Sequence, residues 1–134
     1  MKKFLSLLLI AASLLIFCSC GVTDKKISKN LKEMEEAKEI SYTLLEKDSR
    51  ASIKKEIEDE QYETLKGEIE KGYSVYSKTE DGYSIVLVFE KSADAKAAQK
   101  VFEKEIEDEK NTVVKRSGKI LIVGTDKLAE KIAK

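Results

Sequence analysis

Five consecutive apolar residues, Ile85 to Phe89, constrain the fold of this chain more than any other feature. A strand with water on one side alternates apolar and polar residues, whereas a strand covered on both faces is apolar throughout. Asp81-Gly82 precedes the run, and Asp-Gly between β-prone segments is a strong hairpin signal. The sequence therefore predicts a hairpin of 73–79 and 83–89 whose second strand lies in the centre of a sheet.

Two helical patterns precede this hairpin. Apolar residues spaced by three and four predict helices over about 27–45, capped by Thr23 or Asp24, and over about 50–71, with Gly72 as the C-terminal cap residue. Asp48 and Ser49 are the expected break between them. The segment 40–45 also alternates with period two and is β-prone, so a strand there is the alternative to the helix that we favour.

The second half repeats the change from helix to strands. Ser92 is the expected cap of a third helix, and Asp94 stands in its first turn, where a carboxylate suits the helix dipole. Strands are expected over 112–115 and 120–123, joined by a turn at Ser117-Gly118. A short last helix carries Leu128, Ile132 and Ala133.

This order, α-α-β-β-α-β-β-α, predicts the α+β class, with an antiparallel sheet of about four strands and helices on one face. If 40–45 is a strand, the order becomes β-α-β-β-α-β, the ferredoxin-like arrangement. Either order forms one small domain over 27–134.

One hexapeptide occurs twice. Lys-Glu-Ile-Glu-Asp-Glu stands at 55–60 and again at 104–109, each time in a predicted helix that precedes a predicted hairpin. Duplication of an α-β-β unit explains this and fits a sheet with pseudo-twofold symmetry. Coincidence in a Lys/Glu-rich chain is the alternative, because charged helix faces resemble one another.

The composition argues against most chemistry. The chain has no His and two Cys, both near the N-terminus, so we expect no metal and no cofactor. Ser52 to Lys55 fits S-x-x-K, but the partner motifs of that enzyme class do not occur. The acidic runs at 56–60 and 105–108 lie in predicted helices beside lysines, which is typical of solvated ion-paired faces rather than calcium loops. We assign no catalytic residue.

Three tyrosines gather on the first predicted hairpin. Tyr73, Tyr76 and Tyr83 lie on its two strands, and Tyr76 and Tyr83 approach each other across the turn. Cross-strand aromatic pairs stabilise sheets, which is the structural interpretation. Tyrosine is also enriched at interface anchors, so the functional interpretation is a partner-binding patch.

The N-terminus suggests a location. Lys2 and Lys3 precede 14 almost purely apolar residues, 4–17, which are too few for a membrane span of ~20 residues but suit an export signal. The segment ends in Phe17-Cys18-Ser19-Cys20-Gly21. It resembles the lipobox of bacterial lipoproteins, with small residues before an obligatory Cys and with Phe17 where the family usually has Leu.

The resemblance implies cleavage before Cys20, which would carry a diacylglyceryl thioether and acyl chains such as palmitate. Residues 1–19 are then the signal peptide, 20–26 the lipidated Cys and a short tether, and no thiol remains for a disulfide. Two or three acyl chains anchor a protein stably. The exported part has 23 basic and 25 acidic residues, and it has no basic block, which argues against nucleic acid.

The expected location is the outer face of a membrane. Abundant Lys, Glu and Ile and the absence of Pro are typical of a low-GC bacterium, so we favour a Gram-positive cell. In a Gram-negative cell, Gly21 in place of Asp implies the outer membrane or periplasm by the same resemblance.

Three functions remain open. The first is a non-enzymatic domain that binds a protein or another envelope component. The second is an accessory or inhibitor subunit of one partner, docked through the edge of the hairpin. The third is a small cell-wall enzyme that uses only carboxylates.

Overall fold

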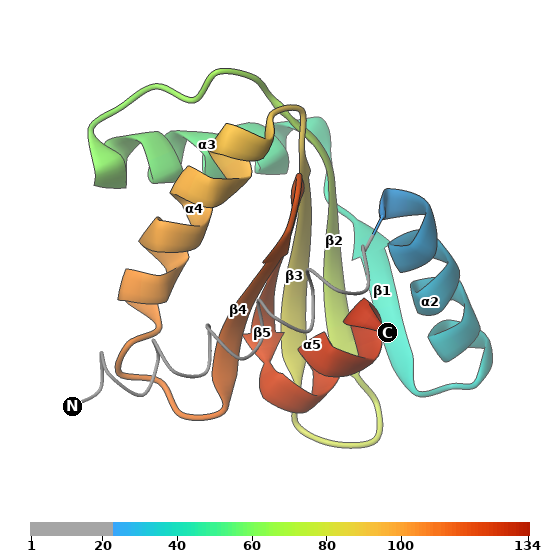
Figure 1. Ribbon diagram of the computed structural model, residues 1–134. Helices are drawn as coiled ribbons and strands as arrows, with labels where there is room; N and C mark the ends of the chain where they lie inside the picture. The colour runs from blue at the N-terminus through green and yellow to red at the C-terminus, as the bar shows by residue number, and fades with distance from the viewer. Residues whose placement is uncertain (1–22) are drawn as a thin grey trace.

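The computed structural model describes residues 23–134, which form one five-stranded antiparallel sheet with four helices packed on it (Figure 1). The strand order is β1-β2-β3-β5-β4. The α+β class predicted from the sequence is confirmed. The elements are α2 (Asp24–Glu36), β1 (Ile40–Leu44), α3 (Lys47–Gln61), β2 (Ile69–Ser77), β3 (Tyr83–Phe89), α4 (Ser92–Glu105), β4 (Thr112–Ser117), β5 (Ile120–Thr125) and α5 (Asp126–Ala133).

Helices cover both faces of the sheet. One buried cluster joins α2 and α5 to the strands and includes Val86, and a second joins α3 and α4 to the other face and includes Leu87. Val86 and Leu87 are neighbours on β3 and both are completely buried. The central strand is thereby confirmed, and the expectation that all helices share one face is wrong. A strand with two apolar faces requires cover on both.

Residues 40–44 form the strand that the sequence left as the alternative. Thr23 caps α2 as predicted, since its Oγ1 accepts a hydrogen bond from the Lys26 amide at 3.2 Å. The helix ends at Glu36, however, and Lys38 takes a left-handed φ of 61°. Pairing with β2 supplies backbone hydrogen bonds along β1 and buries Ile40. These tertiary contacts stabilise the strand more than the helical spacing of apolar residues favours a helix.

The sheet is not ferredoxin-like. The elements from β1 to β4 do follow the order β-α-β-β-α-β. In that arrangement the two parallel strands of each β-α-β unit are separated by a third, antiparallel strand, whereas here β1 lies at an edge of the sheet and pairs directly with β2.

The second helix is shorter than predicted. Its N-cap is Glu46, not Asp48 or Ser49, and it ends at Gln61 because Tyr62 takes the left-handed conformation, with φ of 58°. Gly72 is therefore not a helix cap but lies inside β2. There a Cβ atom would stand 2.6 Å from Leu45 Cδ1, so any larger residue would have to displace that side chain.

The two copies of the hexapeptide belong to equivalent units. The segments α3-β2-β3 and α4-β4-β5 contribute the strand order β2-β3-β5-β4, which a twofold rotation between β3 and β5 would reproduce. Ile57 and Ile106, the central residues of the copies, lie in the same buried cluster. Only the start of the second copy is helical, because α4 ends at Glu105. Duplication stays a prediction, and the arrangement agrees with it.

Candidate functional site

Tyr76 and Tyr83 form an exposed aromatic pair across the β2–β3 hairpin. They stand directly opposite each other in the register, and their ring centroids lie 4.8 Å apart at an interplanar angle of 50°. This contact was predicted. Tyr76 is 53% exposed and Tyr83 is 40% exposed, although both are held on rigid strands. Large aromatic side chains fixed in this way lose little conformational freedom when a partner covers them.

Tyr73 does not belong to this pair. Successive strand residues point to opposite faces, so residues three apart, such as Tyr73 and Tyr76, cannot share one. Tyr73 is buried against Tyr42 with ring centroids 6.2 Å apart, and its hydroxyl lies 3.3 Å from Asp24 Oδ1. Burial, followed by the charge of Asp24, raises the pKa of the Tyr73 phenol. The expected three-residue patch is wrong for Tyr73, and strand alternation could have excluded it.

Uncharged side chains surround the pair. Ser41 stands opposite Tyr76 on β1, Thr43 lies two residues further along the same face, and both are exposed. On the other side, Thr125 Oγ1 accepts a hydrogen bond from the Tyr83 amide at 3.0 Å. We call Ser41, Thr43, Tyr76, Tyr83 and Thr125 the tyrosine surface. Four of these five residues are exposed and Thr125 is half-buried, and none of the five carries a charge.

The helices leave this end of the sheet open. Along β3, Tyr83 is exposed, Ile85 is half-buried, and Leu87 and Phe89 are completely buried, and these four residues share one face. The burial increases toward the end where α3 and α4 pack. The tyrosine surface is thus the uncovered remainder of a face whose other half is core.

The hairpin has no open edge. β2 pairs with β1 on its outer side, and β3 pairs with β5. The predicted docking of a partner through the hairpin edge is therefore excluded by the sheet order, and the exposed part of the hairpin is its face.

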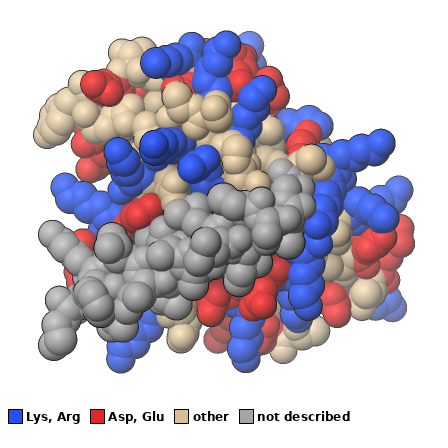
Figure 2. Space-filling view, in the orientation of Figure 1, with Lys and Arg blue, Asp and Glu red and all other residues tan. Residues whose placement is uncertain are grey.

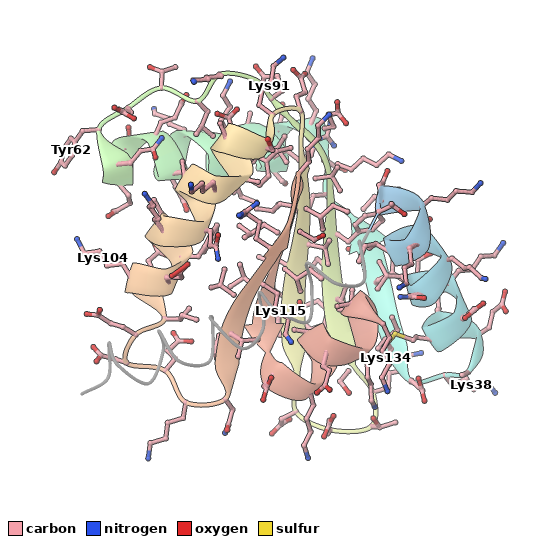
Figure 3. All side chains as sticks on the ribbon, in the orientation of Figure 1. Lys38, Tyr62, Lys91, Lys104, Lys115 and Lys134 are labelled. Atoms are coloured by element: carbon pink, nitrogen blue, oxygen red, sulfur yellow. The ribbon has the colours of Figure 1, made fainter. Side chains whose placement is uncertain are left out.

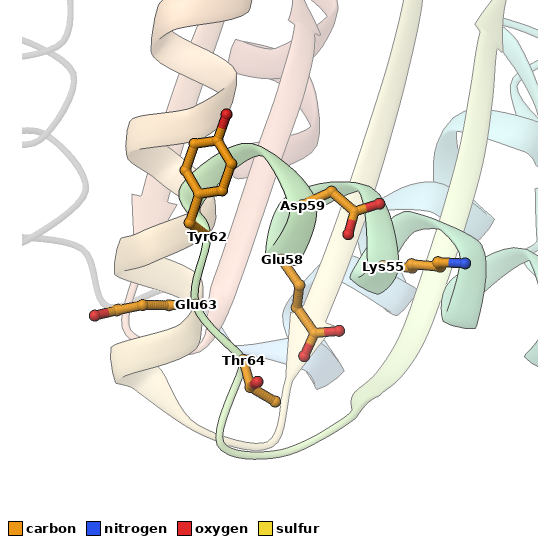
Figure 4. A pocket seen from close by; sticks show the side chains of 6 residues that line it. All are labelled: Lys55, Glu58, Asp59, Tyr62, Glu63 and Thr64. Carbon is orange, nitrogen blue, oxygen red and sulfur yellow. The ribbon is translucent and has the colours of Figure 1, made fainter.

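A surface depression lies at the end of α3 (Figure 4). Its lining side chains diverge from the helix end and the following loop instead of pointing toward one centre: Lys55, Glu58, Asp59, Tyr62, Glu63 and Thr64. Glu58 Oε2 accepts a hydrogen bond from the Leu65 amide at 2.8 Å, so this carboxylate holds the loop. Tyr62 is 93% exposed and projects away from the domain (Figure 3).

Charges of both signs are interspersed over the face that Figure 2 shows. Within residues 23–134, no group of three or more potential metal ligands lies together. Every helix in that same range is too short or too polar to cross a bilayer. Cys20 lies outside the described residues, so its lipidation stays a prediction.

The buried carboxylate of Asp94 has a structural role that the sequence did not reveal. Only 3% of this residue is exposed, and its two oxygens accept hydrogen bonds from the amides of Lys66 and Gly67 at 2.9 and 2.8 Å. Asp94 therefore fixes the loop between α3 and β2 against the first turn of α4. A sequence pattern shows the helix position of this residue but not the loop that it binds.

The two hexapeptide copies bring carboxylates together. Burial, and then the charges of Glu60, Glu56 and Glu109, raise the pKa of Glu105. The folded state holds the proton of such a carboxyl group more tightly than the unfolded state does. The free energy of unfolding therefore falls as the pH rises from the pKa of the unfolded state through the pKa of the folded state, because the group becomes ionised.

We expect Glu105→Gln to raise the free energy of unfolding at pH 7. The gain should be about 0.5 kcal/mol or less, because the side chain is exposed and solvent screens its charge. It should disappear below about pH 4, where the carboxyl group is protonated in both states. Urea unfolding at the two pH values measures this. Glu130→Gln on α5 is the control, because it removes one negative charge elsewhere on the domain. An equal increase in the free energy of unfolding in both variants would contradict a specific cost of ionising Glu105.

No protein-family model matches this chain, and neither a curated protein nor a solved structure matches it significantly.

Proposed function

We propose that this protein is a lipid-anchored, non-enzymatic domain on the outer face of the cell membrane, where it binds an envelope protein. The observation that carries the binding proposal is the exposed Tyr76–Tyr83 pair on the uncovered half of the sheet. The anchoring proposal rests on the lipobox-like residues that end at Cys20.

The chemistry of the tyrosine surface favours a protein partner. Interface centres are depleted in charge and enriched in aromatic residues, and tyrosine is frequent among the residues that dominate binding energy. Here two adjacent tyrosines are flanked by the exposed hydroxyls of Ser41 and Thr43, which can satisfy a partner's polar groups. Phosphate-rich ligands such as nucleic acids require cations, and the tyrosine surface has none.

The placement of the surface suits an anchored binder. Helix α2, which follows the proposed anchor, packs on the opposite face of the sheet from Tyr76 and Tyr83. Attachment and binding would then use different faces, so a partner would not have to displace the membrane.

Replacing both tyrosines tests the binding proposal. In intact cells, chemical crosslinking followed by mass spectrometry should capture a dominant partner with the unaltered protein. The double variant Tyr76→Ser/Tyr83→Ser should reduce that capture by about thirtyfold or more, because an interface anchor contributes ≥ ~2 kcal/mol. The domain should still fold, since an exposed cross-strand pair contributes only about 1 kcal/mol.

Tyr62→Ser is the matched control, because it removes an equally large exposed tyrosine at the end of α3. Circular dichroism of each variant checks folding. Undiminished capture by the folded double variant, or equal loss in Tyr62→Ser, would contradict binding through the tyrosine surface.

A further inference from the structure

A groove of about 320 Å³ opens beside the start of α2. It is lined by Ser28 of α2, by Tyr42, Leu44 and Leu45 at the end of β1, by Arg50 of α3 and by Lys71 to Tyr73 of β2. Asp24, the first residue of α2, contacts two of these residues: its carboxylate lies 3.0 Å from Lys71 Nζ and 3.3 Å from the Tyr73 hydroxyl. The groove is therefore adjacent to the point where the chain enters the domain.

The tether from the proposed anchor is short. Only three residues separate Cys20 from Asp24. A fully extended chain spans at most ~3.3–3.6 Å per residue, so the Cα atoms of Cys20 and Asp24 lie within about 14 Å of each other. If Cys20 carries acyl chains in the bilayer, this end of the domain must lie at or near the membrane surface.

The side chains at the groove suit a lipid–water boundary. Leu44 is 63% exposed, and it is the one aliphatic residue among the exposed large apolar side chains of residues 23–134. Tyr42 lies beside it, and tyrosine is enriched at membrane interfaces. An exposed leucine next to a tyrosine is therefore suited to contact the acyl chains at a lipid–water interface.

Two cations line the same groove as the leucine. The Arg50 guanidinium is held in place by hydrogen bonds from Nε to the Ile69 carbonyl at 3.0 Å and from Nη1 to the Leu45 carbonyl at 2.7 Å. Lys71 is half exposed and pairs with Asp24. An exposed ion pair of this kind is weak, so Lys71 can exchange Asp24 for another anion at little cost. Fixed and mobile cations around an apolar side chain match the phosphates of anionic lipids.

We propose that this groove is a membrane-contact face that receives anionic phospholipid, with Leu44 at the acyl boundary and Arg50 and Lys71 at the headgroup phosphates. The inference rests on the proposed anchoring through Cys20. Its consequence is orientation: with the α2 side of β1 against the lipid, the tyrosine surface on the other face of the sheet is kept accessible.

The absence of Trp makes a direct test simple, because one introduced Trp is the only source of its fluorescence. The chain from Cys20 to Lys134 contains every residue of both buried clusters and has a single thiol, which can be coupled to a maleimide lipid in vesicles. Leu44→Trp and, as the matched control, Tyr62→Trp are compared in vesicles of phosphatidylglycerol and phosphatidylcholine, with brominated lipid as the quencher.

We expect quenching of the Trp at position 44 in phosphatidylglycerol vesicles and little quenching at position 62. Adding Lys71→Gln should weaken the contact about fivefold, since a cation near an anionic surface contributes ≈ 1 kcal/mol. Equal quenching at both positions would overturn the membrane-contact face. Equal quenching in both lipids, or no effect of Lys71→Gln, would overturn the assignment to anionic phospholipid.

Chemical coupling replaces biological acylation, so this result does not depend on how cells process Cys20. A failure of the anchoring proposal appears in the processing of Cys20 variants in cells, whereas a failure of the groove proposal appears in the vesicles.

Discussion

Asp94→Ala is expected to lower the free energy of unfolding by about 3 kcal/mol, because hydrogen bonds to a charged group contribute ~1.5–3 kcal/mol each and two are lost. The substitution leaves the amides of Lys66 and Gly67 without the carboxylate that now binds them at 2.9 and 2.8 Å. Small domains have a total stability of ~5–15 kcal/mol, so the loss is a large fraction of it. Urea unfolding of residues 21–134 measures the change.

Two control variants give this prediction its specificity. Asp94→Asn keeps the shape and one acceptor oxygen but turns an NH₂ group toward one amide, so it should cost about half as much. Asp59→Ala removes an exposed carboxylate from α3 and should change stability by less than ~0.5 kcal/mol. Equal stability of Asp94→Ala and Asp59→Ala would contradict the structural role of Asp94.

Cys20→Ala is expected to abolish lipid attachment. In the proposed anchoring, the Cys20 thiol is the acyl acceptor and cleavage before Cys20 requires its acylation, so the variant should accumulate as a precursor that retains residues 1–19. Metabolic labelling with a palmitate analogue and mass spectrometry of the N-terminus measure both effects. The unaltered protein should incorporate the label and begin at Cys20.

Cys18→Ala is the control that shows whether acylation requires Cys20 in particular or any cysteine in this segment. Cys18 lies in the part that the proposed cleavage would remove, so this variant should be cleaved and labelled normally. Mature, membrane-attached Cys20→Ala protein would contradict the anchor, and so would loss of labelling in Cys18→Ala.

Local sequence patterns correctly predicted the elements for which the pattern favours a single kind of structure. The apolar run at 85–89 placed β3 in the centre of the sheet, and Asp81-Gly82 predicted the hairpin that brings Tyr76 opposite Tyr83. These features depend on residues close together in the chain. The repeated hexapeptide lies near the ends of α3 and α4, which begin the two α-β-β units, and its origin by duplication stays a prediction.

Two errors in secondary structure arose where distant contacts decide the structure, and one error in the site was local. Residues 40–44 fit both a helix and a strand, and only pairing with β2 selects the strand. Helix α3 ends at Gln61 because the chain must turn into β2, with Tyr62 in a left-handed conformation that few side chains adopt. Tyr73 was grouped with Tyr76 by proximity in sequence, although strand alternation puts the two on opposite faces.

A photocrosslinking side chain placed at Ser41 tests binding through the tyrosine surface most directly. Ser41 is exposed and stands opposite Tyr76, so a partner on this surface must contact it. The same side chain at Tyr62, 93% exposed at the end of α3, is the control. We expect irradiation of intact cells to give one dominant crosslinked protein from position 41 and none of it from position 62. The same products from both positions, or none from position 41 in folded, membrane-attached protein, would contradict the proposed function.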